Sequence, residues 1–401
     1  MTGSNTSGSA GTIRIEVNGR AFMGWKSAQI VSGLDQIATQ FAVSVTRSYP
    51  ADSVVRIRPG DLVRVLIGDD LVCTGYVDKC PISYDGAGYT VSASGRSKAG
   101  DIVDSCVTTE IKAGNGSSGT TGWSGVKYRA DGTPVKALGG ASQWRLIDAK
   151  KVIATLIKPY GLSLYADDAS ALWVASVAVS KGTKVSEAIK KLIQQKNLIA
   201  TDTESGDLRL VSGDFPERAA GVIRASADGE QTNVLSGACS FDYSRVYSRY
   251  EVYGQSKPDK AGKAVESNAR AEASSQALGV RGRTLRIFES GSVLQSEVQA
   301  RATFELIYRL GRAKTTTYKI NGWRQESGEL WKKGTLVRVF DEILGFDDWM
   351  MIGKVTFEMS DAGCTTTLEV APRSAYSQKK SSGWDDGESV ARAIGVARTD
   401  K

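Results

Sequence analysis

The chain of 401 residues contains no histidine. Histidine is the commonest general base and the commonest transition-metal ligand, so its absence excludes Ser-His-Asp and Cys-His catalysis. The cysteines are odd in number and show neither a close pair nor the spacing of a metal site, which argues against a disulfide framework. We expect these five residues to behave as small buried hydrophobic groups: Cys73, Cys80, Cys106, Cys239 and Cys364.

Other features are missing as well. No apolar run approaches the roughly 18 residues of a membrane-spanning helix. No phosphate-binding glycine motif stands between a strand and a helix. The net charge is +7, but the basic residues are scattered, and the longest like-charge runs are pairs such as Lys150–Lys151 and Lys332–Lys333. We therefore predict a generally solvated surface, no metal, no cofactor and no specific nucleic-acid site.

A glycosidase that uses a pair of carboxylates is the catalytic class that these absences leave open. Its candidate residues are Asp69–Asp70, Asp167–Asp168, Asp347–Asp348 and Glu110. Adjacent aspartates in loops usually form turns and carry solvated charge. The sequence therefore favours a protein that is not an enzyme.

The pattern of the remaining residues predicts a β-rich α+β fold, with two similar small β-barrels and an inserted α+β middle domain. Short alternating segments such as Gly11–Asn18 predict strands in the first barrel, and two segments with helical apolar spacing predict the helices of the middle domain. The predicted divisions are a disordered leader at 1–11, a first barrel at 12–100, a middle domain at 101–232 with a Gly/Ser-rich loop at 112–143, a bridging segment of strands and a helix at 233–316, a second barrel at 317–373 and a polar tail at 374–401.

Three local predictions are specific enough to check. Pro50 and Pro59 bracket a short strand at Ser53–Arg58. The Lys-, Ala- and Ser-rich residues 256–280 read as an exposed loop. A long amphipathic helix follows, and Gly311 is expected to end it as a C-terminal glycine cap.

A short repeat supports two copies of one barrel. Gly60–Val65 reads GDLVRV and Gly334–Val339 reads GTLVRV, identical at five of six positions. In each copy a Gly-x-Val strand, an Asp/Gly turn and another strand follow in the same order, which indicates an internal duplication. By this alignment Gly75 corresponds to Gly353, and the predicted inward-facing core residues are Val63, Val65, Val77 and Val91 in the first copy and Val337, Val339, Val355, Leu368 and Val370 in the second.

The chain resembles the baseplate hub proteins of contractile-tailed phages, the Mu-like tail protein P family, which is related to the late control protein D and T4-type hub proteins. The resemblance covers most of residues 12–373. It is carried by four stretches: TIRIEVNGRAFMGWKSAQIVSGLDQIATQFAVSVT, GRSKAGDIVDSC, QWRLIDAKKVIATLIKPYGLSL and KVSEAIKKLIQQKNLIATDTESGDLRLV. They are similar to the family's first barrel, its crossover into the middle domain and its two middle-domain helices.

The resemblance implies a structural protein of the virion, assembled in the host cytoplasm. Its homotrimer would form a pseudo-six-fold ring that joins a central spike protein to the tail tube protein. It would help to initiate tail assembly with the tape measure protein, and would contact baseplate wedge proteins. DNA would pass through the lumen without specific binding, and no catalytic residue is implied.

Two alternatives remain open at this stage. One is a tail-associated peptidoglycan hydrolase, which the lack of histidine and of separated catalytic carboxylates disfavours. The other is a carbohydrate- or nucleic-acid-binding barrel protein, which would need exposed aromatic platforms. The candidate platforms are Trp25, Trp123, Trp323, Trp331 and Trp349, although aromatic residues in strand-rich proteins usually belong to the core.

Overall fold

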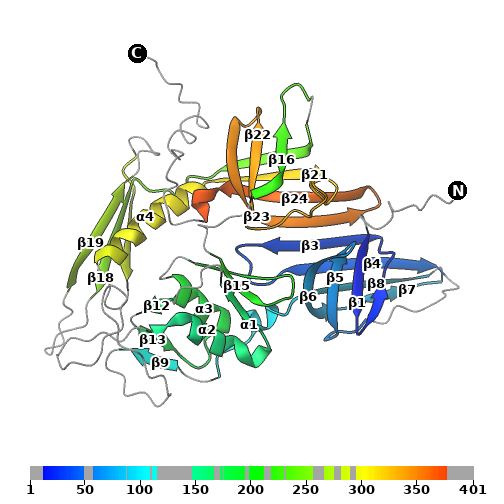
Figure 1. Ribbon diagram of the computed structural model, residues 1–401, viewed down its shortest axis with the longest axis horizontal. Coiled ribbons are helices and arrows are strands. Elements are labelled where there is room, and N and C mark those ends of the chain that lie inside the picture. Colours follow the sequence, from blue (N-terminus) through cyan, green and yellow to red (C-terminus); the bar gives the residue numbers. More distant parts are fainter. Residues whose placement is uncertain are drawn as a thin grey trace.

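A computed structural model describes residues 12–48, 57–86, 88–108, 111–114, 147–166, 172–174, 176–194, 198–211, 218–229, 232–255, 266–274, 281–289 and 295–376. Figure 1 shows two sheet-rich layers, one above the other, with a helical unit beside the lower layer. A small sheet and a long helix lie at the far end. No helix in the described ranges has both the length and the apolar character needed to cross a membrane.

The N-terminal sheet, drawn in blue shades in Figure 1, contains the first eight strands. Its order is β3-β4-β8-β6-β5-β1-β2, with β7 paired to β8, and all pairings are antiparallel. Buried and half-buried residues alternate along β1 and β8, as expected for strands with one face in a core. The strands are β1 (Ile13–Val17), β2 (Arg20–Phe22), β3 (Ser27–Gly33), β4 (Gln40–Ser48), β5 (Leu62–Ile67), β6 (Asp70–Lys79), β7 (Ile82–Tyr84) and β8 (Gly88–Ser97).

The C-terminal sheet has the order β17-β21-β24-β23-β22-β16, and only β16 runs parallel to its neighbour. Its first and last strands meet at Asn233. The Asn233 side chain donates to the carbonyl of Val222 at 2.6 Å and accepts from the backbone N–H of Arg224 at 2.8 Å. The strands are β16 (Arg218–Ala225), β17 (Val234–Phe241), β21 (Lys314–Asn321), β22 (Leu336–Asp341), β23 (Phe346–Ser360) and β24 (Gly363–Pro372).

The long strand β23 joins the two sheets. Its first part, Phe346–Met351, pairs with β22. After an irregularity between Ile352 and Lys354, its second part, Lys354–Met359, pairs with β3 of the N-terminal sheet. The two sheets therefore form one continuous hydrogen-bonded structure of 14 strands, and a single hydrophobic cluster contains residues of both.

The middle unit lies beside the lower layer in Figure 1 and has its own core, which includes Ile102, Ile153, Ile189 and Leu208. Asp148 caps α2 by accepting a hydrogen bond from the backbone N–H of Lys150 at 3.1 Å. The elements are α1 (Gly100–Asp104), β9 (Ile111–Gly114), β10 (Ile147–Asp148), α2 (Ala149–Ile157), the 3₁₀ turn η1 (Lys158–Tyr160), β11 (Leu164–Ala166), β12 (Trp173–Val174), β13 (Ser176–Val179), α3 (Val185–Gln194), β14 (Ile199–Asp202) and β15 (Leu208–Val211).

The fourth group is a three-stranded sheet covered on one face by the long helix. Val298 and Ala302 of the helix pack on Val252 of the central strand. The C-terminal end of the helix contacts a 3₁₀ turn, which is the last described element of the chain. The elements are β18 (Arg249–Gln255), β19 (Glu266–Ser274), β20 (Thr284–Glu289), α4 (Gln295–Arg312) and the 3₁₀ turn η2 (Arg373–Ala375).

The prediction of a β-rich fold is confirmed, but three local predictions are wrong. Residues 266–274, expected in a loop, form β19, because their alternating residues pair along β18. Gly311 does not cap α4, which continues to Arg312. A Cβ atom at Gly311 would lie 2.4 Å from the backbone nitrogen of Ala375, so glycine there permits close contact with η2. Cys106 is exposed and Cys80, Cys239 and Cys364 are half-buried, which leaves Cys73 as the buried thiol.

Several predictions fall on residues outside the described ranges. They include the leader at 1–11, most of the strand at Ser53–Arg58, nearly all of the Gly/Ser-rich loop at 112–143, and the tail after residue 376. Within the described part, β16 and β17 pair with the C-terminal sheet although they lie in the ranges predicted for the middle domain and the bridging segment.

Candidate functional site: a repeated sheet and its three-way junction

The residues predicted as barrel core lie together. Each is at most 2% exposed, and all belong to the cluster shared by the two sheets. The residues are Val63, Val65, Val77, Val91, Val337, Val339, Val355, Leu368 and Val370.

The repeat extends beyond the hexamer that revealed it. The strands β3-β4-β8-β6-β5 and β17-β21-β24-β23-β22 follow each other in the same spatial order, with antiparallel pairing throughout. The backbone N–H of Gly60 donates to the carbonyl of Val77 at 2.8 Å, and the N–H of Gly334 donates to the carbonyl of Ile352 at 2.8 Å. Both ladders contain an irregularity just after these acceptors, between Val77 and Lys79 and between Ile352 and Lys354.

The hydrogen-bonded ladder corrects the alignment made from sequence. Val63 lies opposite Gly75, and Val337 lies opposite Met350, so Gly75 corresponds to Met350 rather than to Gly353. By the same registers Val77 corresponds to Ile352, Ala93 to Leu368 and Gly95 to Val370. On the last strand, the alignment made from sequence is displaced by two residues from the observed pairing. A displacement of two residues keeps every side chain on the same face of the sheet.

The arginines inside the repeated hexamer make cross-strand ion pairs. Arg64 donates to Glu16 on β1 at 2.9 Å, and Arg338 pairs with Asp347 on β23. These are partly exposed contacts on the outer face of each sheet, where such pairs add little to stability.

The candidate catalytic carboxylates are dispersed. Asp70 pairs with Arg324 at 2.7 Å, and Asp69 lies 3.7 Å from Arg14. Asp347 is held by Arg338, and burial raises the pKa of the adjacent Asp348 above its ordinary value. Asp167–Asp168 and Glu110 lie outside the described residues. In the described ranges no three carboxylate or thiol groups come together as a metal site.

The candidate tryptophans that the structure describes do not form an exposed platform. Trp25, Trp323 and Trp331 are at most 7% exposed, and Trp349 is half-buried. The indole of Trp323 donates to the carbonyl of Glu358 at 3.0 Å. Trp123 lies outside the described part of the chain.

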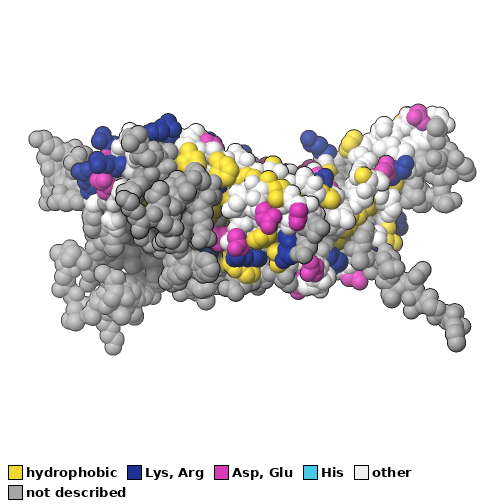
Figure 2. All heavy atoms as spheres, turned by 90° about the horizontal axis from the view of Figure 1, so that it is seen from above, with side chains coloured by type: hydrophobic (Ala, Val, Ile, Leu, Met, Phe, Trp, Pro, Cys, Tyr) yellow, Lys and Arg dark blue, Asp and Glu magenta, His cyan; other side chains and the backbone are white. Residues whose placement is uncertain are grey.

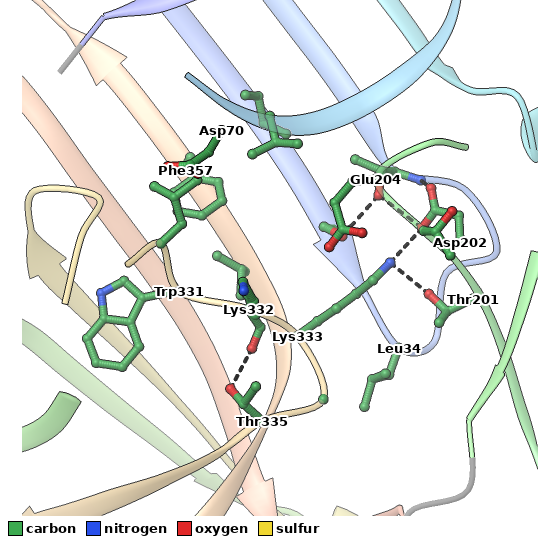
Figure 3. Close-up of a pocket in the computed structure, with 18 of the residues that line it drawn as sticks. Leu34, Asp70, Thr201, Asp202, Glu204, Trp331, Lys332, Lys333, Thr335 and Phe357 are labelled. Atoms are coloured by element: carbon green, nitrogen blue, oxygen red, sulfur yellow. Dashed lines mark hydrogen bonds and ion pairs between the residues drawn. The ribbon is translucent and has the colours of Figure 1, made fainter. Parts of the chain in front are cut away.

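The two sheets and the middle unit meet at Asp202, the last residue of β14. Its carboxylate accepts from the backbone N–H of Thr39 at 2.7 Å and from the Thr39 hydroxyl at 3.0 Å. The Lys333 ammonium reaches it at 2.5 Å from the segment before β22, and also contacts Thr201. Figure 3 shows Lys333 extended toward Asp202 and Thr201. Because the Asp202 side chain is fully buried, this ion pair fixes three parts of the chain at one point.

A cavity of about 600 Å³ opens beside this junction. Trp331 and Phe357 contribute apolar walls, while Glu204 and Lys332 add charge, as Figure 3 shows. Both Asp202 oxygens are already bound by protein donors. The geometry therefore describes a packed junction rather than a site with a free base.

Sequence reasoning missed this junction. Lys332–Lys333 was visible only as a charge pair, and Asp202 only as a polar residue near a turn. Thr39 and Asp202 are 163 positions apart, so no local pattern links them.

A second contact ties α4 to the junction. Arg312, at the end of α4, pairs with Asp35 of the loop between β3 and β4. Its guanidinium lies over the rings of Tyr376 and Tyr308, with centroid distances of 4.9 and 5.3 Å. The ion pair with Asp35 links the helix to the N-terminal sheet, and the cation–π contact with Tyr376 links it to the segment that follows β24.

The other face of the β18 sheet carries a network of ion pairs, in which Glu272 also pairs with Arg249 at 3.0 Å. Arg249, Arg270 and Arg286 are each more than half exposed and surround the buried Glu251. The hydrogen bond from Arg286, at 2.8 Å, holds the pKa of Glu251 below its ordinary value. In Figure 2 dark blue side chains gather at this end of the molecule.

Models of known families match three parts of the chain. Residues 12–97 match the N-terminal domain described as Mu phage baseplate assembly protein GpP-like. Residues 136–212 match the second domain of the baseplate hub protein gp44-like family, and residues 295–379 match the fourth domain of Mu phage baseplate assembly protein GpP. Together these matches cover more than half of the chain.

Individual proteins agree with these models. The baseplate hub protein gp44 of Escherichia phage Mu is 22% identical over 374 residues, which are 91% of this chain and 89% of that protein. The 43 kDa tail protein of prophage MuSo2 from Shewanella oneidensis has a TM-score of 0.70 at 23% identity, over 91% of this chain and 99% of that one. A tail protein from Neisseria meningitidis MC58 has a TM-score of 0.69 at 18% identity, over 95% of this chain and 98% of that one.

The order of the matches along the chain, first, second and fourth domain, is the order of one hub protein. The relatives that they describe are structural components of the phage baseplate. The chain belongs to the family of Mu-like phage baseplate hub proteins.

Proposed function

We propose that this hub protein forms a homotrimer whose sheets build a pseudo-six-fold ring between the tail tube and the central spike. The observation that carries the proposal is the repeated strand order of the two sheets, joined by the pairing of β23 with β3. Two similar units in each of three chains supply six similar units around one axis. Such a ring offers six-fold symmetry to one partner and three-fold symmetry to another.

Each sheet is proposed to act as a small barrel. The contact of Asn233 with β16 brings the ends of the C-terminal sheet together. The middle domain is then an insertion between the barrels, and β16 and β17 belong to the second barrel. The proposed core of both barrels is the set of buried valines and Leu368 described above.

The proposed partners follow from the place of a hub in the baseplate. They are the tail tube protein on the pseudo-six-fold side, the central spike protein on the three-fold side, the tape measure protein during the initiation of assembly in the host cytoplasm, and wedge proteins at the periphery. DNA would pass through the lumen without a specific site.

The oligomeric state tests this proposal. Sedimentation of the full chain, alone and with the spike protein of the same phage, should show a trimer in at least one of the two samples. A monomer in both would overturn it.

We also propose that the protein has no catalytic role. The support is the pairing of the candidate aspartates with arginines and their separation in space. A gel containing bacterial cell walls should show no clearing at the position of this chain. Clearing that is lost on Asp70→Asn or Asp347→Asn would instead indicate a hydrolase.

A further inference from the structure

The two sheets leave complementary strand edges open. Within the chain, the outer half of β23 pairs with β3. In the repeat, β17 occupies the place of β3, because β17 pairs with β21 as β3 pairs with β4. The counterpart of the outer half of β23 is β7, since Ile82 lies opposite Val91 as Phe357 lies opposite Thr366. In the described ranges, β7 pairs only with β8 and β17 only with β21, so one edge of each is open.

We propose that β7 of one copy pairs antiparallel with β17 of the next copy and so repeats the β23–β3 ladder between chains. This inference names the interface of the trimer proposed above and rests on that proposal. Each chain then carries one ladder internally and makes one with each neighbour, which is a head-to-tail contact that can close into a ring.

The register follows from the internal ladder. Phe357 lies opposite Ile30, and Glu358 lies opposite Gln29. Because Ile82 corresponds to Phe357 and Cys239 to Ile30, Ile82 of one copy faces Cys239 of its neighbour. One residue further along, Ser83 faces Ala238, as Glu358 faces Gln29.

The backbone groups fit this register. The Pro81 carbonyl accepts from Ser92 on β8 at 3.0 Å, and the Asp85 N–H donates to Gly88 at 2.9 Å. Backbone groups alternate between the two sides of a strand, so those of Ile82 and Tyr84 point to the open edge. Pro81, which has no N–H, points inward and costs the interface no hydrogen bond.

The same holds on the other strand. The N–H of Asp242 donates to Ala313 at 3.0 Å, toward the end of β21. By alternation, the backbone groups of Gly237, Cys239 and Phe241 point to the open edge. Two of these three residues, Gly237 and Cys239, face Tyr84 and Ile82 in the proposed register.

Exposure and charge also fit. Ile82 and Tyr84 are 57% and 81% exposed, and Leu235 and Phe241 on the other strand are 58% and 45% exposed. Large apolar side chains on an open strand edge favour association with another strand. The register also sets Lys79 opposite Asp242, both exposed, and two hydrogen bonds from Ser244 keep the pKa of Asp242 below its ordinary value.

Disulfide cross-linking of the full chain tests this ladder. Ser83→Cys and Ala238→Cys place two thiols on the outer face at a cross-strand pair that is not hydrogen-bonded, where the Cα atoms of adjacent strands lie about 4.5 Å apart. After mild oxidation, the double variant should give covalent dimers and trimers on a denaturing gel, reversed by reductant. Each single variant should remain largely monomeric on the same gel.

Two matched variants control the geometry. Gln29→Cys with Glu358→Cys probes the equivalent internal pair and should form a bond within one chain, which changes mobility but not mass. Ser83→Cys with Ser240→Cys is displaced by two residues and should cross-link several-fold less than the proposed pair.

The outcomes separate the interface from the trimer. A sedimenting trimer in which the internal pair bonds but Ser83→Cys/Ala238→Cys does not would overturn the ladder and leave the trimer standing. Stronger cross-linking of the displaced pair would overturn the register. Monomers throughout, with and without spike, would overturn both the ladder and the trimer.

A charge reversal tests the proposed pair of Lys79 and Asp242. Where a trimer sediments, Lys79→Glu should weaken the trimer a few-fold, and adding Asp242→Lys should restore it. A double variant that does not restore the trimer would count against the pairing.

Discussion

The two sheets share five strands in one spatial order but differ in the sixth. In the N-terminal sheet β1 runs antiparallel to β5, whereas in the C-terminal sheet β16 runs parallel to β22. The five common strands are therefore the unit that the two sheets share, and the sixth strand depends on how the chain enters each sheet. The β1 strand comes from the N-terminus, and β16 follows the middle unit.

Equivalent positions also carry different side chains. Gly75 and Gly95 of the N-terminal sheet correspond to Met350 and Val370. A Cβ atom at Gly75 would lie 1.9 Å from the carbonyl oxygen of Arg96, and one at Gly95 would lie 2.0 Å from that of Tyr76. The N-terminal sheet thus brings β6 and β8 closer at this point than a larger residue permits. The same topology is built with different packing.

We expect the largest effect from a charge that is buried at a position shared by the two sheets. Val63 and Val337 are both 0% exposed, so Val63→Asp and Val337→Asp should each lower the free energy of unfolding by about 4 kcal/mol or more. Urea unfolding followed by circular dichroism measures this. Leu62→Asp, at a residue 46% exposed, is the control and should change little. If Val337→Asp behaves like this control, the inward face of the second sheet is assigned wrongly.

Because the two sheets are packed differently, we expect the N-terminal sheet to be destabilised by a larger side chain and the C-terminal sheet by a smaller one at the equivalent position. Gly75→Ala should destabilise the protein by about 3 kcal/mol, because the added methyl group meets backbone. Met350→Ala should cost about 2–5 kcal/mol for the reverse reason, the cavity that it leaves. Gly86→Ala, where no atom lies within 4 Å of the new Cβ atom, should be nearly neutral. A neutral Gly75→Ala would contradict the close approach of β6 and β8.

The residue before each repeated hexamer distinguishes the copies further. Pro59 is exposed, whereas Lys333 enters the junction and pairs with the buried Asp202. Lys333→Met should cost about 3 kcal/mol, because it leaves a buried carboxylate without its cation. Adding Asp202→Asn should recover part of this loss, as a thermal melt would show. Equal stability of the single and double variants would contradict the coupling.

The smallest expected effect concerns Asp348. Its position in the C-terminal sheet is equivalent to that of the buried Cys73 in the N-terminal sheet. Burial raises its pKa in the folded protein, so the folded state binds the proton more tightly than the unfolded chain. The contribution of Asp348 to the free energy of unfolding is therefore greatest below the ordinary aspartate pKa of about 3.9. This contribution is lost as the pH rises through the pKa of Asp348 in the folded protein. Asp348→Asn should raise the melting temperature slightly at pH 7, and the gain should vanish on acidification. A gain that does not depend on pH would exclude this cause.

The sequence was sufficient to predict the β-rich fold, the helices of the middle unit and the repeat. It was not sufficient for the register of the repeat. The Gly-x-Val match aligned Gly75 with Gly353, but the ladder is set by backbone pairing with the hexamer strand, and the turns before β6 and β23 differ in length. The predicted core residues still lie on the buried face. On the last strand the slip is two residues, which preserves the face. On β23 the slip is three residues, but it spans the irregularity between Ile352 and Lys354, which takes up one residue, so that Val355 is buried like Ile352.

Contacts between segments that are distant in the chain could not be predicted from the sequence. Asp202, Thr39 and Lys333 lie in three different parts of the chain, and none belongs to a periodic pattern. The match of β17 to β3 was missed because their sequences differ, and the similarity lies in their pairing with β21 and β4. Pairing partners in a sheet become visible only when the strands are assembled.

An electron microscope image of the assembled hub, viewed down its axis, tests the central proposal most directly. We expect three chains, with six similar sheet units alternating between N-terminal and C-terminal sheets around a central channel, and a three-fold outline on the opposite side. A ring in which each chain contributes one unit, or in which like sheets contact each other, would contradict it.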